Sequence, residues 1–228
     1  MTRTEQVYGE LRADILNGRL RPGSRLPFAE LSARYGSSLS AIREGLQRLV
    51  EQGLVISEPQ LGFRVVALSE DDLADLTAAR CEIEGMALRQ SVEHGDLTWE
   101  SGVVAALHVL DRTEVETPGR RRGLSNRWTT AHGAFHEALI AGCPNRRIRM
   151  IASSLRDSAE LYRHWSFGTE AATRDIPAEH RAMAEAALER DAARAVTLLC
   201  DHLATTSRLL IEQSTSKNTN HTELRGAS

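Results

Sequence analysis

Residues 38–53, SLSAIREGLQRLVEQG, form the clearest helix pattern in the N-terminal third of the chain. The apolar residues of this stretch recur at the spacing of one helix face, and Gly53 ends the helix. They are Ile42, Leu46, Leu49 and Val50. The other face carries Leu39, Ser40, Arg43 and Gln47. The pattern therefore predicts a helix that is buried on one side and presents a separate set of side chains on the other.

Two further helices precede this stretch, and a hairpin follows it. Apolar spacing predicts helices over residues 4–17, ended by Gly18, and over residues 28–35, ended by Gly36. Residues 54–68, LVISEPQLGFRVVAL, indicate two short strands around a Pro-Gly turn. This order is typical of a winged helix-turn-helix, in which the second helix of the pair lies in the DNA major groove. On layout alone, a small helical domain without a ligand is the alternative.

The segments LRADILNGRLRPGSRL, SAIREGLQRLVEQGLV and GFRV resemble the DNA-binding domain of GntR-type bacterial transcription regulators. The resemblance covers nearly all of residues 5–67 and keeps the spacing of helix, loop and wing. It implies that the partner is double-stranded DNA, with a homodimer bound to a palindromic operator. It also implies a repressor, because release of DNA on ligand binding is the commoner behaviour of the family.

The candidate DNA contacts lie at the start of residues 38–53 and at the tip of the wing. They are Ser38, Leu39, Ser40, Arg43, Gln47 and Gly62. Family members usually carry an arginine where this chain has Leu39, and some carry another where Ala29 stands. Arginine reads guanine through two hydrogen bonds, whereas leucine meets only a thymine methyl group or a sugar. We therefore expect an operator that differs from the family's common one, with Arg43 retained as a reader.

Charge and cysteine usage fit a DNA-binding protein of the cytoplasm. The net charge of the 228-residue chain is −3, but its first 66 residues hold nine arginines against seven acidic residues. A mildly basic N-terminal part is compatible with nucleic acid. The three cysteines are far apart, and the chain has no apolar core of a signal peptide and no apolar run of about 18 residues. We expect a reduced, cytoplasmic protein.

Residues 69–213 indicate an all-α antiparallel bundle of six helices, so the fold class is mainly α. The helices are predicted over residues 69–94, 98–115, 124–141 and 145–165, then from Pro177 and from Asp191 to about Glu212. Residues 214–228 lack apolar periodicity and are predicted to be a disordered tail. The expected domains are therefore residues 1–68, residues 69–213 and the tail.

Four histidines of the predicted bundle share features of a metal site. His132 and His136 are four residues apart, so both imidazoles point from one face of a helix. His180 lies in the first turn of the fifth predicted helix, and His202 lies between apolar residues of the sixth. Taken singly, each could be an ordinary histidine held by a hydrogen bond.

The segments HGAFHEALIAGCPNRRI, AEHRAMAEAALERDAARA and HLATTSRLL, with LSEDDLADLTAARCEIEGMAL before them, resemble the FCD ligand-binding domain of FadR-like GntR regulators. The resemblance covers roughly residues 70–212. Many FCD domains bind a divalent metal through an aspartate and three histidines. The resemblance implies a site of His132, His136, His180 and His202, with His132 in place of the usual aspartate.

The exchange of aspartate for histidine changes the charge of the implied site. An imidazole in place of a carboxylate removes one negative charge, which favours an anionic effector or hydroxide at the metal. Imidazole ligands suit zinc first, with nickel or iron as alternatives. Alternatively, His132 does not bind the ion, which leaves three histidines and a water, as in some catalytic zinc sites.

The implied partner of the bundle is a small organic acid. Arg80 matches an arginine of the family's first FCD helix and can hold a carboxylate through two hydrogen bonds. A surface ion pair between Arg80 and Glu84 is the alternative. Arg156 and Tyr162 are further candidates for effector contacts.

A metal-dependent enzyme that uses the four histidines is the alternative function. Four imidazoles fill a tetrahedral site and leave little room for a substrate. The sequence has neither an HExxH nor a GxSxG motif. Because a DNA-binding domain is attached, we expect a regulator and not an enzyme.

Overall fold

The computed structural model describes the chain except for residues 1, 17, 116–124, 167–173 and 226–228. The chain forms two compact units. The winged-helix unit comprises residues 1–73 and 157–165, and the bundle unit comprises residues 74–156 and 166–228. The domain boundaries expected from the sequence remain predictions.

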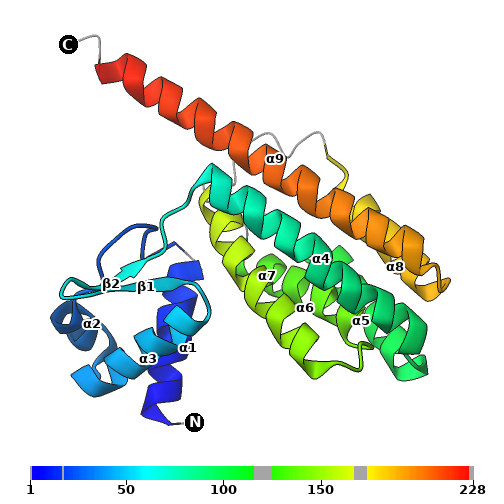
Figure 1. Ribbon diagram of the computed structural model, residues 1–228, viewed down its shortest axis with the longest axis horizontal. Coiled ribbons are helices and arrows are strands. Elements are labelled where there is room, and N and C mark those ends of the chain that lie inside the picture. The colour runs from blue at the N-terminus through cyan, green and yellow to red at the C-terminus, as the bar shows by residue number, and fades with distance from the viewer. Residues whose placement is uncertain (1, 17, 116–124, 167–173, 226–228) are drawn as a thin grey trace. The chain divides into compact units, whose positions relative to one another are not determined.

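The winged-helix unit has the element order expected from the sequence (Figure 1). Its helices are α1 (Arg3–Leu16), α2 (Phe28–Tyr35) and α3 (Leu39–Glu51). Strands β1 (Val55–Glu58) and β2 (Gly62–Val65) form an antiparallel hairpin in which Val55 pairs with Val65. Helix α3 begins where the Ser38 side chain accepts a 3.3 Å hydrogen bond from the Ala41 amide, as a capping residue does.

The core of the winged-helix unit is aliphatic and draws on all three helices and the hairpin. It includes Val7, Leu11, Ile15, Leu31, Ile42, Leu46, Leu49, Leu54 and Val65. Helices α1 and α3 approach closely at Gly45, where an added Cβ would lie 3.2 Å from a Leu11 methyl carbon. The buried stripe predicted for residues 38–53 is thus the surface on which α1 packs.

The bundle unit is built from helices alone among the described residues (Figure 1). They are α4 (Glu70–His94), α5 (Leu97–Asp111), α6 (Asn126–Ile140), α7 (Arg146–Ser166), α8 (Ile176–Leu188) and α9 (Ala192–Arg225). Asp96, Ser125 and Asp175 cap α5, α6 and α8 by accepting hydrogen bonds from main-chain amides. The mainly helical fold, a winged helix followed by a six-helix bundle, is confirmed.

Helix α9 is longer than the sequence pattern predicts. Residues 214–228 were expected to form a disordered tail, but α9 continues to Arg225. No proline or glycine occurs in residues 192–225. Extending an existing helix fixes one residue for each hydrogen bond gained, so a polar segment without a helix breaker can continue it.

None of the described helices combines the length and the apolar composition that crossing a bilayer requires.

The core of the bundle unit is apolar, with Leu88, Phe135, Leu139 and Met183 among its buried side chains. Polar side chains interrupt this core at one level, and the candidate site lies there.

Candidate metal centre and DNA-reading surface

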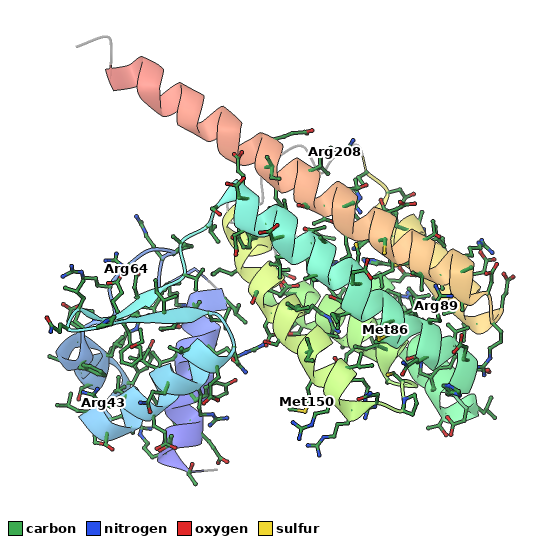
Figure 2. All side chains as sticks on the ribbon, in the orientation of Figure 1. Arg43, Arg64, Met86, Arg89, Met150 and Arg208 are labelled. Carbon is green, nitrogen blue, oxygen red and sulfur yellow. The ribbon has the colours of Figure 1, made fainter. Side chains whose placement is uncertain are left out.

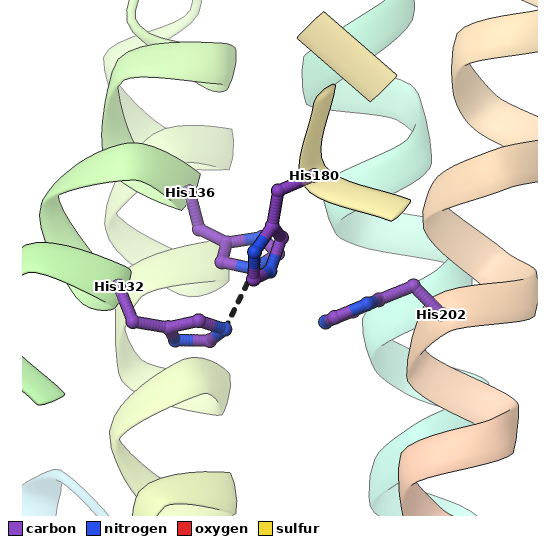
Figure 3. A group of neighbouring side chains, drawn as sticks. All are labelled: His132, His136, His180 and His202. Atoms are coloured by element: carbon purple, nitrogen blue, oxygen red, sulfur yellow. Dashed lines mark hydrogen bonds between the residues drawn. The ribbon is translucent and has the colours of Figure 1, made fainter. Parts of the chain in front are cut away.

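Four histidine side chains converge inside the bundle unit, as Figure 3 shows. His132 and His136 come from α6, His180 from the start of α8, and His202 from α9. All four are buried, with exposed fractions of 1%, 1%, 2% and 4% in that order. The structure brings together every residue of the predicted metal set, although the residues lie up to 70 positions apart in the chain.

The donor atoms are close enough to share one ion. Each histidine offers one ring nitrogen, and these four nitrogens all lie within 4.8 Å of one another. The Nε2 atoms of His132 and His136 are 3.2 Å apart. In a tetrahedral zinc site with ordinary bond lengths, two ligand nitrogens lie about 3.4 Å apart. The α6 pair already has this separation, so the residues present fit a transition-metal ion.

His136 is held in the neutral form that binds metals. Burial, followed by the neighbouring His202 and His180, lowers the pKa of His136 well below its ordinary value of 6.5. Its Nδ1 atom is buried and has no hydrogen-bond partner in the part of the chain that the structure describes. A neutral imidazole offers a lone pair without first releasing a proton.

A carboxylate outside the cluster orients His202. Its Nδ1 atom lies 2.8 Å from Glu179 Oε2, and we assign the ring proton to Nδ1 because a carboxylate only accepts. The Nε2 lone pair is then left for a metal. Burial would raise the pKa of Glu179, but its hydrogen bonds with His202 and Arg174 lower it to about 2. Arg174 also donates to the His202 carbonyl oxygen at 3.0 Å.

An indole ring covers the other side of the cluster. The ring of Trp128 stacks on that of His132, with centroids 4.7 Å apart and an interplanar angle of 25°. Trp128 is itself buried. His132 is therefore packed between an aromatic ring and the other histidines, a setting that restricts its orientation.

Two arginines and a glutamate form a second buried polar cluster. Arg80 Nε donates to Glu84 Oε1 at 2.6 Å, and Arg156 Nε lies 3.7 Å from Glu84 Oε2. All three side chains are at least nine-tenths buried. The predicted alternative of a surface pair between Arg80 and Glu84 is wrong in one respect, because the pair is buried. Both guanidinium groups are among the charges that lower the pKa of His136, so this cluster acts on the histidine site.

The arginine cluster has more donors than acceptors. Arg156 Nη1 donates to the half-exposed Glu137 at 2.8 Å. The Nη2 atoms of Arg80 and Arg156 are buried and make no hydrogen bond within the described residues. Two positive charges face one fully buried carboxylate. Unpaired buried guanidinium donors are costly, and an anion that accepted from them would remove this cost.

Tyr162 has a different setting from the two arginines. Its hydroxyl donates to Asp72 and accepts from the Ser69 amide at 3.3 Å. These hydrogen bonds of Tyr162 are with residues 69–72 and not with the four histidines. The tyrosine ties the start of α4 to α7.

The predicted DNA contacts lie on one exposed face of α3. Leu39 is 57% exposed, and Ser40, Arg43 and Gln47 are exposed with it. The Arg43 guanidinium stands over the ring of Phe28, with its central carbon 4.6 Å from the ring centroid. Figure 2 shows Arg43 on α3 at the outer side of the winged-helix unit. The aromatic contact holds the long side chain in one direction before it meets a ligand.

The hairpin forms the second part of this surface. Gly62 starts β2 with a φ of 90°, a left-handed value that side chains rarely adopt, and an added Cβ would meet no atom within 4 Å. The turn therefore needs glycine for its backbone conformation and leaves open space beside it. Arg64 lies two residue pairs further along the hairpin, and its guanidinium donates to Glu58 at 3.1 Å and to the Gly23 carbonyl oxygen.

Sequence reasoning missed Arg174 and the sharing of Glu84 between two arginines. Arg174 stands in the segment SFGTEAATRD, which has no periodicity that would indicate a buried side chain. Glu84 was considered only as a partner of Arg80. Its contact with Arg156 joins α4 to α7, and no spacing rule within one helix predicts such a contact.

Comparison with known families gives two matches that together span most of the chain. Residues 3–65 match the sequence profile described as bacterial regulatory proteins, gntR family. Residues 75–205 match that of the FCD domain. The first match coincides with the winged helix, and the second contains all four histidines of the candidate metal centre.

Three known proteins illustrate the similarity. The chain is 40% identical to the uncharacterized HTH-type transcriptional regulator BphR of Paraburkholderia xenovorans (strain LB400), over 87% of this chain and 81% of BphR. It is 33% identical to the HTH-type transcriptional repressor GlaR of Escherichia coli (strain K12), over 87% and 91%. The solved structure of E. coli McbR/YncC matches 94% of this chain and 99% of its own, with a TM-score of 0.77 and 20% identity. This last likeness concerns the fold alone.

Proposed function

The chain belongs to the gntR family of bacterial transcription regulators and carries an FCD domain, and on this premise we propose that it is a metal-dependent repressor that responds to a small organic acid. The α3 face and the wing bind operator DNA. The four histidines hold a divalent ion, zinc in the first place. The acid binds inside the bundle unit and changes the affinity for DNA.

The buried cluster of four imidazoles is the observation that carries the metal proposal. Imidazole nitrogens are preferred ligands of divalent transition metals, and here four of them lie within 4.8 Å of one another inside an apolar core. A divalent ion would bind one nitrogen of each ring, and it would supply Lewis acidity that attracts an anionic ligand. The separation of 3.2 Å between two Nε2 atoms and the Glu179 partner of His202 support this reading.

The charge balance of the same region supports an anionic effector. Four neutral imidazoles leave the charge of a divalent ion uncompensated. Arg80 and Arg156 together add more positive charge than Glu84 removes. A carboxylate can bind a metal ion with one end and accept from guanidinium donors with the other. The effector role of Tyr162 has less support, because its hydroxyl is engaged by Asp72 and the Ser69 amide.

We infer that the centre senses its ligand and does not catalyse a reaction. Four imidazoles fill the coordination of a tetrahedral ion, whereas catalytic zinc sites keep one position for water or substrate. The relatives are transcription regulators. A ligand can change DNA binding only if it binds one conformation of the chain more tightly than another. The affinity for DNA is therefore the quantity to measure.

Metal binding is tested by comparing His136→Ala with His108→Ala, which removes an exposed histidine of α5. We expect the unchanged chain and His108→Ala to bind one zinc ion per chain in a competition with a chromophoric chelator. His136→Ala should bind zinc at least about 100-fold more weakly, because it loses a ligand and not only an outer partner. Equal zinc affinity of the two variants would remove the metal proposal.

Regulation is tested by the binding of the metal-loaded chain to DNA from upstream of its own gene. We expect specific binding, weakened by about 1–3 kcal/mol in Arg43→Ala. A panel of small mono- and dicarboxylates is then added, and at least one should lower the DNA affinity of the unchanged chain but not of Arg80→Gln. If the chain showed no specific DNA binding, the proposal of a regulator would be contradicted. If it bound DNA but no acid changed the affinity, only the proposal of an organic-acid effector would be contradicted.

A further inference from the structure

Two cysteines that the candidate metal centre does not use face each other between α4 and α9. The thiol of Cys81 points to the Cys200 carbonyl oxygen at 4.0 Å, and the thiol of Cys200 points to the Cys81 carbonyl oxygen at 3.8 Å. Residues 119 positions apart in the chain are thus directly opposite each other.

The two helices are also in contact one turn away from the cysteine pair, at Gly85 and Val196. One turn after Cys81, an added Cβ on Gly85 would lie 3.2 Å from a Val196 methyl carbon. Val196 lies one turn before Cys200, so both contacts belong to one antiparallel register of α4 and α9 (Figure 1). The packing of the helices therefore fixes the separation of the two thiols, which does not depend on a mobile loop.

The third cysteine has a different environment. Cys143 is buried, and its thiol contacts Gln90 Oε1 at 3.1 Å. Cys81 and Cys200 are only partly buried, so a small oxidant can reach them. The described chain thus contains one thiol pair and one isolated thiol, and the latter serves as an internal control.

We propose that Cys81 and Cys200 are a modification site, at which hydrogen peroxide converts the thiol pair to a reversible disulfide. One thiol sulfur attacks the peroxide O–O bond, which forms a sulfenic acid and releases one water. The second sulfur displaces the hydroxyl group of the sulfenic acid, which forms the S–S bond and releases a second water. The two sulfurs lose two electrons in total and the peroxide gains them. A dithiol returns both sulfurs to thiols.

The disulfide would clamp the two helices that frame the candidate site. Arg80 precedes Cys81 on α4, and His202 lies two residues after Cys200 on α9. A covalent link between these helices opposes any separation of α9 from α4, and so slows the escape of an ion held by His202. This consequence rests on the proposed metal function, whereas formation of the disulfide does not.

Disulfide formation is tested in the full chain by exposure to hydrogen peroxide, capping of the remaining thiols and mass mapping of the peptides. Burial and the neighbouring Cys200 side chain raise the pKa of Cys81 to about 12, which keeps the thiolate fraction small, so incubations of hours are required. We expect a linked Cys81–Cys200 peptide in the unchanged chain and in Cys143→Ser, removed by dithiothreitol. Cys200→Ser should give none. A link to Cys143, links only between chains, or full retention of free thiols would overturn the proposal.

The clamp is tested separately by the rate at which zinc passes to EDTA from oxidised and reduced chain. We expect at least a several-fold slower loss after oxidation in the unchanged chain and no change in Cys200→Ser. Equal rates in the presence of a mapped disulfide would overturn the clamp. Failure of either form to bind zinc would instead count against the proposed function, and peptide mapping would still decide the disulfide.

Discussion

The two units use polar side chains in opposite ways. The winged-helix unit buries an aliphatic core and presents its candidate functional residues, among them Arg43 and Gln47, to solvent. The bundle unit buries its candidate functional residues, four histidines and two arginines, inside the core. In the first unit stability and function rest on different faces of one helix. In the second they share the same interior.

This difference predicts how the units respond to change. A surface that reads DNA can lose a side chain with little effect on folding, because water replaces the lost contact. An interior that holds polar groups depends on the partners of those groups, including any bound ion. Stability of the bundle unit should therefore depend on metal, whereas stability of the winged-helix unit should not.

The largest expected effect is that of Leu46→Ala, which removes a fully buried side chain of α3. The transfer and cavity costs of such a change are about 2–5 kcal/mol. We expect the urea-induced unfolding of the winged-helix unit to shift by this amount and DNA binding to weaken with it. Zinc binding should stay unchanged. Gln47→Ala, the exposed neighbour, should cost less than about 0.5 kcal/mol. Loss of zinc binding in Leu46→Ala would show that the interiors of the two units are not independent.

The second largest expected effect is the stabilisation of the bundle unit by bound zinc. At a free concentration of about 100 times the dissociation constant, a ligand that binds only the folded state stabilises it by about 2.7 kcal/mol. We expect this increase in the unfolding free energy of the bundle unit, reversed by EDTA. In His136→Ala the increase should disappear. An equal rise in the stability of the winged-helix unit would show that the ion acts outside the four-histidine cluster.

A smaller effect, on zinc affinity, is expected when Glu179, the hydrogen-bond partner of His202, is replaced. Glu179→Gln keeps the size of the side chain but loses the carboxylate that accepts from His202 Nδ1. Loss of such an outer partner typically weakens metal binding by about 10–100-fold. Chelator competition measures the change, with Glu185→Gln on the exposed side of α8 as the matched control. If both variants bound zinc equally, the negative charge of Glu179 would make no contribution to metal binding.

The smallest effect concerns the start of α3. Ser38→Ala removes the hydroxyl that caps the helix and should cost the winged-helix unit about 1 kcal/mol. Because the cap lies beside the candidate DNA contacts, operator affinity should fall slightly as well. Ser40→Ala, an exposed change two residues further on in the first turn of the same helix, should leave the unfolding midpoint almost unchanged. Equal midpoints for the two variants would mean that Ser38 makes no capping contribution.

The same division explains what the sequence could predict. Helix α3 follows a regular alternation of buried and exposed positions, so both its core face and its candidate DNA face could be predicted. The four histidines could be grouped only through the resemblance to FCD domains, because they lie on three helices whose packing no spacing rule gives. Their convergence in the structure agrees with that grouping, while metal binding stays a prediction.

The failures have physical causes as well. The end of α9 was misjudged because polar residues without a helix breaker permit a helix without requiring one. Arg174 was missed because it stands in an aperiodic segment and because its partners, Glu179 and His202, come from two different helices, α8 and α9. The burial of Arg80 and Glu84 was missed because spacing of four residues describes a buried pair and a surface pair equally well.

The stacking of Trp128 on His132 has an optical consequence. Indole is the main fluorophore of proteins, and this chain has three tryptophans, of which Trp128 has its ring centroid 4.7 Å from that of a candidate ligand. An open-shell ion such as copper(II) or nickel(II) at the cluster would quench the emission of that indole, whereas closed-shell zinc would not. Occupancy of the bundle could then be followed in real time by intrinsic fluorescence, without a label and in the presence of DNA.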